Sequence, residues 1–578
     1  MCGIHVSISP SKPPDISTDL KRCLCSRGPD HIATYETRLG NIENDDDDDD
    51  DDGDNDKACA AAHLAFTSTV LALRGDHVAR QPLIDSESAS VLCWNGEAWR
   101  IRQSDVAGND GEVIAALLGE AVRRGRAGRQ DAIMDVFRSI SGPFAFVFLD
   151  KASGKLYFGR DRLGRRSLLI RHDGLQLVLS SVAGSADPLW EEVEAGGVYV
   201  LDLGGERPLG GLAGTTPAVT RLDWLEGEAA VDVVSGIGRF NDAVPGAEAR
   251  PASCSDPVTA LRRQLTESLK LRVLDVPAPP GADETQAHAK VAVLFSGGLD
   301  CTVLARLCHE LLPSGQGIDL INVAFENPRV AANAQKLKGQ EASGLSGVYE
   351  ACPDRMTGRK SFAELRAVCP GRAFRFVAVN IPYTEYLSHK SEVTALIYPH
   401  NTEMDLSIGC ALYFAARGQG LASTDSMPSS SAPYTTPARV LLSGLGADEL
   451  FGGYQRHATA FSRQGYPGLI GELRLDVSRL GERNLGRDDR AMSHWGREVR
   501  FPFLDEELVR WAIETPAWEK CDFGQPGGDV EPGKRVLRLL AVELGMAGVA
   551  SEKKRAIQFG SRTAKMESGR VKGTTLLS

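Results

Sequence analysis

The chain has 578 residues, and at roughly 150 residues per domain this length predicts two to four domains rather than one core. A hydrophobic share of 42% and a charged share of 25% are typical of a globular protein. No apolar run reaches the roughly 18 residues of a transmembrane helix, and the N-terminal residues lack the basic and apolar segments of a secretory signal. We therefore expect a cytoplasmic protein without membrane contact, whose twelve cysteines are free thiols.

The N-terminus carries a cysteine that removal of the initiator methionine would expose, in Met1-Cys2-Gly3-Ile4. A free N-terminal cysteine has its own base, because its α-amino group titrates at about pH 8 and its thiol at about 8.5. The amine can therefore accept the thiol proton at neutral pH and leave a nucleophilic thiolate. A cysteine at position 2 is not by itself specific for this chemistry.

The net charge of −12 is concentrated in one segment. Asp45 to Asp52 is an unbroken run of eight aspartates, and Asp54 and Asp56 follow it. Removing these ten charges from −12 leaves −2, so the folded domains are nearly neutral. The run repels itself and buries no apolar surface, which predicts a disordered acidic insert at 41–57. No basic patch with interleaved aromatic residues indicates nucleic-acid binding.

The first 203 residues have the pattern of a sheet-rich domain with few helices. Residues 111–124 have the apolar spacing of a helix. Short β-like runs, separated by Gly and Asp turns, occur at 92–94, 144–149, 156–158, 175–179 and 198–203. Residues 204–256 are rich in Gly, Ala and Pro with weak periodicity, and they fit a linker between domains.

Polar residues with catalytic potential follow the strand at 91–94. The side-chain amide of Asn95 and the N–H of Gly96 can form a two-donor oxyanion hole, although Asn-Gly is also a common hairpin turn. Asp110 can pair with a substrate ammonium or act as a helix N-cap. Together with Cys2, these features resemble the class II glutamine amidotransferase domain of asparagine synthetases, as do Arg27-Gly28-Pro29-Asp30, Gln81-Pro82 and Gly159-Arg160-Asp161.

This resemblance covers residues 1–203 and implies an α+β N-terminal-nucleophile fold with four αββα layers. It implies that Cys2 is the catalytic nucleophile and that Asn95 and Gly96 are the catalytic oxyanion donors. Glu97 and Asp110 are the residues that it assigns to the amino group of bound glutamine.

The same family places an arginine, which binds the glutamine carboxylate, shortly before Gln-Pro. Between Leu64 and Ala79 this chain has only Arg74, which lies closer to Gln81 than the usual spacing. Arg74 is therefore the candidate glutamine-binding arginine, and its spacing is a departure from the family pattern.

Residues 257–578 have a different pattern, in which continuous apolar strands alternate with helices. The strands are predicted at 291–295, 320–325, 376–379 and 440–442, and the helices at 257–272, 301–312 and 405–417. This alternation predicts an α/β domain with a doubly wound parallel sheet, which binds ligands at the carboxyl ends of its strands. The serine-rich segment 422–438 is predicted as a loop insert.

The strand at 291–295 runs directly into Ser296-Gly297-Gly298-Leu299-Asp300-Cys301, and a helix follows. The glycines allow the backbone to approach phosphates, and the helix N-terminus attracts the anion. Ser296 adds a hydroxyl, and Asp300 can reach a phosphate-bound Mg²⁺. In this context Ser-Gly-Gly-x-Asp is typical of the pyrophosphate loop of enzymes that split ATP into AMP and pyrophosphate.

The strand at 440–442 precedes Ser443-Gly444-Leu445-Gly446-Ala447-Asp448-Glu449, and Phe451-Gly452-Gly453-Tyr454 follows. These motifs, with 498–505, resemble the asparagine synthetase domain. The resemblance implies metal ligation by Asp300 and Asp448 and a catalytic role for Lys554. It implies ATP contacts at Leu294, Ser296, Gly297, Gly298, Asp300, Cys301, Phe325, Ser443 and Gly444. The charged residues after position 487 can instead be structural ion pairs.

The family resemblance predicts glutamine-hydrolysing, ATP- and Mg²⁺-dependent amide synthesis, with aspartate as the carboxylate that becomes asparagine. Two departures weaken the assignment of aspartate. Leu445 replaces an acidic residue of the family's Ser-Gly-x-Gly loop, and 402–416 contains no Lys or Arg where the family usually offers one to aspartate. A scaffold with reduced catalysis, or an amide synthetase with another acceptor carboxylate, are the open alternatives.

Overall fold

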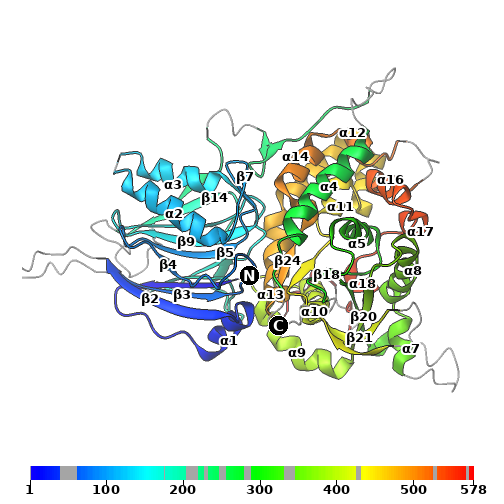
Figure 1. Cartoon of the computed structure of the whole chain (residues 1–578), viewed down its shortest axis with the longest axis horizontal. Coiled ribbons are helices and arrows are strands. Elements are labelled where there is room, and N and C mark those ends of the chain that lie inside the picture. The colour runs from blue at the N-terminus through cyan, green and yellow to red at the C-terminus, as the bar shows by residue number, and fades with distance from the viewer. Residues whose placement is uncertain are drawn as a thin grey trace, which may run out of the picture. The chain divides into compact units, whose positions relative to one another are not determined.

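The computed structural model describes residues 2–39, 62–125, 127–174, 176–203, 219–226, 232–245, 256–278, 288–330, 345–424, 431–524, 530–567 and 572–577. The predicted acidic insert at 41–57 lies outside these residues. The chain divides into two compact units, Met1–Glu226 and Gly227–Ser578 (Figure 1).

The first unit contains two six-stranded antiparallel sheets and a small third sheet. One sheet has the order β13 (Trp190–Glu192), β11 (Leu169–His172), β12 (Leu177–Ser180), β1 (Gly3–Ser9), β3 (Ala62–Val70), β2 (His31–Leu39). The other has the order β15 (Val219–Asp223), β14 (Gly197–Asp202), β10 (Lys155–Arg160), β9 (Phe144–Asp150), β5 (Val91–Gly96), β4 (Leu83–Ile84). The small sheet consists of β7 (Ser104–Asp105), β6 (Arg100–Ile101) and β8 (Ile140–Ser141).

A hydrophobic core joins the two large sheets face to face. Strand β1 alternates apolar and polar residues, so that Ile4, Val6 and Ile8 enter this core together with Val147 and Leu149 of β9. A second core lies between the other face of the β9 sheet and helices α2 (Asp110–Arg123) and α3 (Arg129–Arg138). Helix α1 (Thr18–Arg27) packs against β1 and β3 on the opposite side of the paired sheets (Figure 1).

The second unit is built on a seven-stranded sheet in which the five strands from β20 to β24 in the order below are parallel and the two at the other edge are antiparallel. Its order is β22 (Ala432–Thr435), β21 (Gln419–Ser423), β20 (Phe374–Ile381), β19 (Ile318–Phe325), β18 (Val291–Leu294), β23 (Val440–Leu442), β24 (Glu498–Arg500). The chain leaves β18 toward β19 on one side and returns to β23 on the other. The carboxyl ends of β18 and β23 therefore flank a topological switch point, which is where open α/β sheets bind ligands.

Helices connect and cover these strands (Figure 1). They include α4 (Pro257–Val273), α5 (Leu299–Leu311), α8 (Pro353–Val368), α9 (Tyr383–Ile397), α10 (Glu403–Arg417), α11 (Ala447–Phe451), α12 (Gln455–Ser478), α13 (Gly486–Ser493), α14 (Glu506–Glu514), α16 (Arg535–Glu543) and α18 (Ile557–Gly560). The predicted strands and helices of 257–578 are confirmed, and the expected parallel sheet is present with an added antiparallel edge.

That edge corrects one prediction. Part of 422–438, expected as a loop, forms strand β22, which pairs with β21. Pro433 is tolerated there because β22 is the edge strand and needs no partner on its outer side. The hydroxyl of Tyr434 donates to Asp319 on β19 over 2.8 Å, which holds the edge against the buried part of the sheet.

The segment predicted as a linker, 204–256, also contains regular structure. Strand β15 extends the β14 sheet of the first unit. Strands β16 (Val233–Val234) and β17 (Gly238–Arg239) pair with each other in the second unit. No described helix is long and apolar enough to span a membrane, and every described cysteine is a free thiol.

Gly297, between β18 and α5, generates our first prediction. It has a φ of +81°, and an added Cβ would lie 2.4 Å from the Cα of Gly358. Gly371 has the same φ but open space around it, so Gly371→Ala isolates the backbone strain, about 1–2 kcal/mol. Gly297→Ala adds a clash between two backbones, and we expect it to cost about 2 kcal/mol more in urea unfolding. Equal losses in the two variants would contradict the close approach of α8 to this loop.

Candidate functional sites

Cys2 and Asn95 meet although they belong to different sheets of the first unit. The backbone nitrogen of Cys2, just before β1, donates to Oδ1 of Asn95 at the end of β5 over 2.9 Å. Gln81 Nε2 lies 3.7 Å from Cys2 Sγ, and Arg27 Nε donates to the Cys2 carbonyl oxygen over 3.4 Å. Cys2 is therefore held at its backbone, and its thiol faces a side-chain amide.

The side-chain amide of Asn95 retains an unused donor. Since Oδ1 accepts from Cys2, Nδ2 points away from that bond, and it has no hydrogen-bond partner among the described residues although it is buried. An unpaired buried N–H is costly unless a ligand accepts it, so this geometry fits an oxyanion hole. Asn95 and Gly96 belong to β5 and pair with β9, which excludes the hairpin-turn interpretation.

Gly96 is required by the close approach of β9. An added Cβ would lie 2.6 Å from Phe144 Cβ and 2.7 Å from the Pro143 carbonyl oxygen. Any larger residue would push the two strands apart at the end that carries Asn95.

Three charged residues predicted to bind glutamine also come together in the first unit. Arg74 Nη1 lies 3.7 Å from Glu97 Oε2 and donates to the Ala98 carbonyl oxygen over 3.0 Å. Asp110 Oδ2 accepts from Trp94 Nε1 over 2.9 Å and from the backbone of Ala98 over 2.8 Å. The unusual spacing of Arg74 thus does not keep it from this cluster.

Asp110 is not the N-cap of α2, because Asn109 takes that position and its Oδ1 accepts from Glu112 N over 3.1 Å. Burial raises the pKa of Asp110, and the charge of Arg74 together with two donated hydrogen bonds opposes that rise. A buried carboxylate beside one guanidinium is suited to bind a second cation, such as the ammonium of an amino acid.

Gln81 was not assigned a role from sequence. Its amide connects two parts of the site, because Nε2 faces Cys2 Sγ while Oε1 accepts from the Trp94 backbone over 2.8 Å. The sequence signal was its position in the Gln81-Pro82 pair.

In the second unit, the predicted pyrophosphate loop lies at the switch point between β18 and α5. Gly298 N donates to Ser296 Oγ over 3.3 Å, and Ser361 Oγ donates to the Gly297 carbonyl oxygen over 2.7 Å. The loop after β23 lies beside it, since a Cβ on Gly444 would lie 2.9 Å from Asp300 Cβ. The two motifs predicted to bind ATP therefore form one site.

Two carboxylates and two ammonium groups form the charged centre of that site. Lys534 Nζ lies 2.8 Å from Asp300 Oδ1 and 2.9 Å from Asp448 Oδ1. The contact to Asp448 is an ion pair without aligned hydrogen-bond geometry. Lys554 Nζ forms a second ion pair with Asp448 Oδ2.

The pKa shifts in this centre follow from burial and from the opposed charges. Burial raises the pKa of Asp300, and Lys534 opposes that rise. For Asp448 burial acts in the same sense, but Lys534 and Lys554 outweigh it and lower its pKa. Burial opposes the charge of Lys534, yet the two carboxylates raise its pKa. These shifts favour the charged forms of Asp448 and Lys534, at the centre of a cluster in which two acidic side chains meet two basic ones.

Lys534 was not found from sequence. It precedes α16 in Glu531-Pro532-Gly533-Lys534-Arg535 and has a left-handed backbone with φ of +56°. A lysine at a helix start is an ordinary pattern, and only the fold reveals that this one reaches Asp300. Asp354 was also missed: it begins α8, its Oδ1 lies 3.8 Å from Arg555, and burial raises its pKa to about 7.

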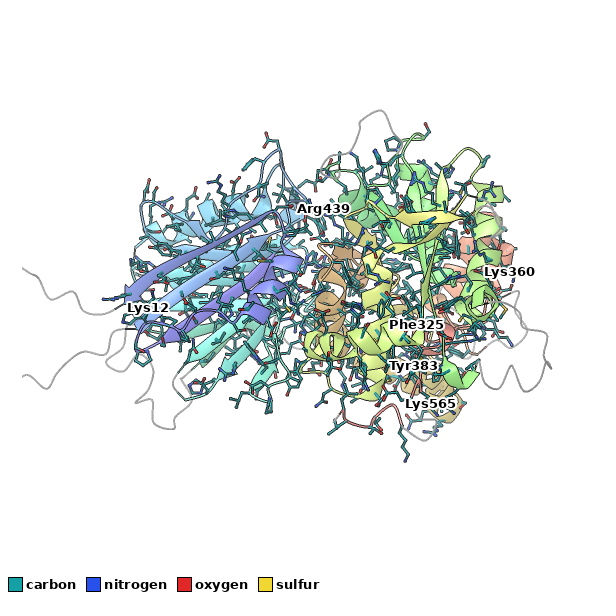
Figure 2. All side chains as sticks on the ribbon, turned by 90° about the horizontal axis from the view of Figure 1, so that it is seen from below. Lys12, Phe325, Lys360, Tyr383, Arg439 and Lys565 are labelled. Atoms are coloured by element: carbon teal, nitrogen blue, oxygen red, sulfur yellow. The ribbon has the colours of Figure 1, made fainter. Side chains whose placement is uncertain are left out.

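The remaining predicted ATP residues differ in their exposure. Leu294 is half-buried at the end of β18, and Cys301 Sγ donates to the Gly298 carbonyl oxygen over 3.3 Å. Phe325 lies at the carboxyl end of β19, inside the second unit (Figure 2). Its ring is fully buried against Phe414 at a centroid distance of 5.7 Å, and its N–H donates to Ser561. The ring of Phe325 thus belongs to the core, so the prediction of an ATP contact is not supported for that side chain.

Arg487 and Arg490 make structural contacts. Arg487 pairs with Asp405 over 2.7 Å and with Asp488 over 2.8 Å. Arg490 donates to the Leu396 carbonyl oxygen over 3.0 Å. Arg487 also supplies α10 with the cation that 402–416 itself lacks, but that charge is already neutralised.

Comparisons with known proteins agree with this arrangement. A family model described as a glutamine amidotransferase domain matches residues 69–186, and one described as asparagine synthase matches 432–475 and 464–574. Asparagine synthetase domain-containing protein 1 of Bos taurus is 33% identical over 99% of this chain and 97% of its own length. The protein of the same name from Homo sapiens is 33% identical, over 87% and 88%.

Asparagine synthetase [glutamine-hydrolyzing] 1 of Arabidopsis thaliana is 24% identical over 75% of this chain and 60% of its own length. A solved glutamine phosphoribosylpyrophosphate amidotransferase from B. subtilis is 14% identical, covering 65% of this chain and 81% of that chain, with a TM-score of 0.25, a likeness too low to support an argument.

The chain thus contains a glutamine amidotransferase domain followed by an asparagine synthase domain. The chain belongs to the family of asparagine synthetase domain-containing proteins.

The unused donor of Asn95 generates our second prediction. Asn95→Asp retains the acceptor for the Cys2 nitrogen but replaces the Nδ2 donor with a carboxylate oxygen, which repels an oxyanion. We expect glutamine hydrolysis to fall by a factor of about 10²–10³ or more, with little change in melting temperature. Glutamate release measured with purified protein tests this, and an unaltered rate would remove Asn95 from the oxyanion hole.

Proposed function

We propose that the chain hydrolyses glutamine at Cys2 and uses the ammonia, with ATP, to convert a carboxylate into an amide. The observation that carries this proposal is the convergence of the Ser296 and Ser443 loops on a balanced group of two carboxylates and two ammonium ions. Phosphate chemistry uses such fixed cations and carboxylates, whereas burying an ion cluster contributes little to stability on its own account.

The glutaminase half begins with removal of Met1. The Cys2 amine, oriented by Asn95 Oδ1, accepts the thiol proton, and the thiolate attacks the amide carbon of glutamine. Asn95 Nδ2 and the Gly96 N–H hold the oxyanion that develops. The ammonium returns its proton to the leaving nitrogen, ammonia departs, and water then hydrolyses the thioester to glutamate.

Glu97 and Asp110 hold the amino group of glutamine. Arg74 lies beside these two carboxylates and binds the carboxylate of the same glutamine. These three roles place the substrate backbone at one end of the site and its side-chain amide toward Cys2.

In the synthetase half, the backbone of Gly297 and Gly298 cradles the ATP phosphates, and Lys534 and Lys554 neutralise negative charge on the departing pyrophosphate. The acceptor carboxylate attacks the α-phosphorus, pyrophosphate leaves, and ammonia displaces AMP from the acyl-adenylate to form the amide.

Mg²⁺ fits this site. Asp300 and Asp448 both reach the one ammonium of Lys534, so both can face a single cation at that place. Among the described residues no cluster of three or more His, Cys, Asp or Glu forms a metal site, so the remaining oxygen ligands would come from ATP and water. When bound, Mg²⁺ would neutralise phosphate charge and orient the phosphates.

Aspartate is the acceptor that we propose first, with asparagine, glutamate, AMP and pyrophosphate as products in the cytoplasm. Leu445 favours a second candidate, an amide synthetase for another carboxylate. The backbone of Leu445 donates to Ser443 Oγ over 3.3 Å, so the loop itself is kept while its acidic side chain is lost.

Two variants test the proposal as a pair. Cys2→Ala should lower glutamine hydrolysis to background while leaving Mg²⁺-dependent pyrophosphate release with free ammonium unchanged. Asp300→Asn should lower that release by about 100-fold or more, because a neutral amide offsets neither Lys534 nor a metal ion, and it should spare glutamine hydrolysis. Each variant is the folding control for the other, since each spares the other unit. Undiminished glutamate production without the Cys2 thiol, or undiminished ATP turnover in Asp300→Asn, would refute the corresponding half.

Leu445 generates a further prediction. A carboxylate in this loop can orient the acceptor or handle a proton, effects of about 10²–10⁴ for a well-placed acid or base, and leucine can do neither. We expect weak aspartate-dependent pyrophosphate release from the native protein and an increase of about 10-fold or more in Leu445→Glu. Leu445→Gln is the matched control, because glutamine has nearly the same shape as glutamate but carries no charge. Strong asparagine formation by the native protein that Leu445→Glu fails to improve would show that the acidic residue is dispensable.

A further inference from the structure

Lys554 makes two close contacts in the described part of the chain. Its ammonium pairs with Asp448 Oδ2 and lies over the ring of Tyr454, 5.5 Å from the ring centroid. One third of the lysine side chain is exposed, and its four-carbon stem is flexible. The position of the ammonium group therefore depends on its attraction to Asp448 and to the ring of Tyr454.

The phenol of Tyr454 is fixed by buried groups. Its hydroxyl donates to Glu449 Oε1 over 2.6 Å, and Glu449 is 4% exposed. Its backbone N–H donates to His457 Nδ1 over 3.2 Å. Because Nδ1 accepts, the proton of a neutral His457 lies on Nε2, which donates to Asp476 Oδ2 over 2.9 Å.

Arg456 holds the ring itself. Its guanidinium carbon lies 3.9 Å from the centroid of Tyr454, and Arg456 Nε donates to the same Asp476 oxygen over 3.1 Å. Asp476, near the end of α12, thus fixes the backbone of Tyr454 through His457 and its ring through Arg456. The ring of Tyr454 is therefore fixed by contacts to its hydroxyl, to its backbone and to one ring face.

The two contacts of Lys554 differ in what happens when ATP arrives. Asp448 is already shared with Lys534, and phosphate oxygens and a metal ion would compete for it. The ring carries no net charge and attracts a cation through its quadrupole, so no anion or metal displaces it. It is the contact that can remain while the ammonium turns from Asp448 toward phosphate.

We propose that Tyr454 is the positioning residue for Lys554, holding the ammonium beside the departing pyrophosphate. The proposal rests on the proposed function, because that function assigns Lys554 to ATP chemistry. Tyr454 touches neither ATP nor the acceptor in this scheme, so its loss should lower kcat for pyrophosphate release and leave KM for ATP nearly unchanged.

Three variants separate the ring from its hydroxyl. Tyr454→Leu removes the ring, and we expect kcat to fall by about 3- to 30-fold. Tyr454→Phe keeps the ring and should retain most of the activity. Tyr466→Leu is the matched control, because it removes a tyrosine within α12, the helix that follows Tyr454, and the hydroxyl of Tyr466 donates to Asp522 over 2.8 Å. Equal kcat values in Tyr454→Leu and Tyr466→Leu would overturn the proposal.

A second measurement does not need turnover. Acetylation of lysines by an amine-reactive ester, followed by peptide mass spectrometry, compares Lys554 with its exposed neighbour Lys553 in the same peptide. Loss of the ring should raise the labelling of Lys554 relative to Lys553 in Tyr454→Leu but not in Tyr454→Phe. An unchanged ratio would show that the ring does not hold the lysine. A native protein without any ATP turnover would refute the proposed function instead, and the labelling ratio would still decide the contact.

Discussion

The ammonium of Lys534 between the carboxylates of Asp300 and Asp448 is the interaction on which the second unit's site depends. Two buried carboxylates side by side repel each other, and each alone would be protonated or would draw in water. One buried cation within 3 Å of both removes that conflict. It also ties together three segments, the first turn of α5, the helix α11 after β23 and the start of α16.

This constraint explains why the site lies where it does. A parallel sheet that reverses its strand order leaves two strand ends side by side without a crossover above them, here those of β18 and β23. Gly444 allows the loop after β23 to approach Asp300 closely, so that Asp300 and Asp448 contact the same ammonium. The cation between them, Lys534, lies 234 residues after Asp300 in the chain.

Local patterns in the sequence predicted what depends on local physics. The buried strands β18 and β23 were recognisable from continuous apolar runs, and the glycines and serine of 296–298 from their position between a strand and a helix. Those patterns could not predict Lys534, because nothing near it differs from an ordinary helix start. Neither could they predict that Phe325 turns its ring into the core, since a strand buried on both faces gives no sign of which side chains reach its end.

The same limit applies to the first unit. Cys2, Asn95 and Asp110 were proposed from motif order, and the structure brings Cys2 against Asn95 across 93 residues. The role of Gln81 depends on the fold, because its amide reaches both the thiol of Cys2 and the backbone of β5. The serine-rich composition of 422–438 predicted a loop and gave no sign of the edge hairpin β21–β22. A specific hydrogen bond from Tyr434 to Asp319 ties that hairpin to the sheet.

The departure from the family pattern at Leu445 lies outside the charged cluster of the proposed ATP site. Asp300, Asp448 and Lys554, which the family resemblance assigns to the ATP site, lie together, and Lys534 joins them. Leu445 changes none of these contacts, because its backbone keeps the loop through Ser443. Removal of any one member of this buried cluster would leave an unpaired buried charge, which is strongly destabilising. In the function that we propose, Leu445 therefore bears on the choice of acceptor carboxylate, while the contacts among Asp300, Asp448, Lys534 and Lys554 do not depend on its side chain.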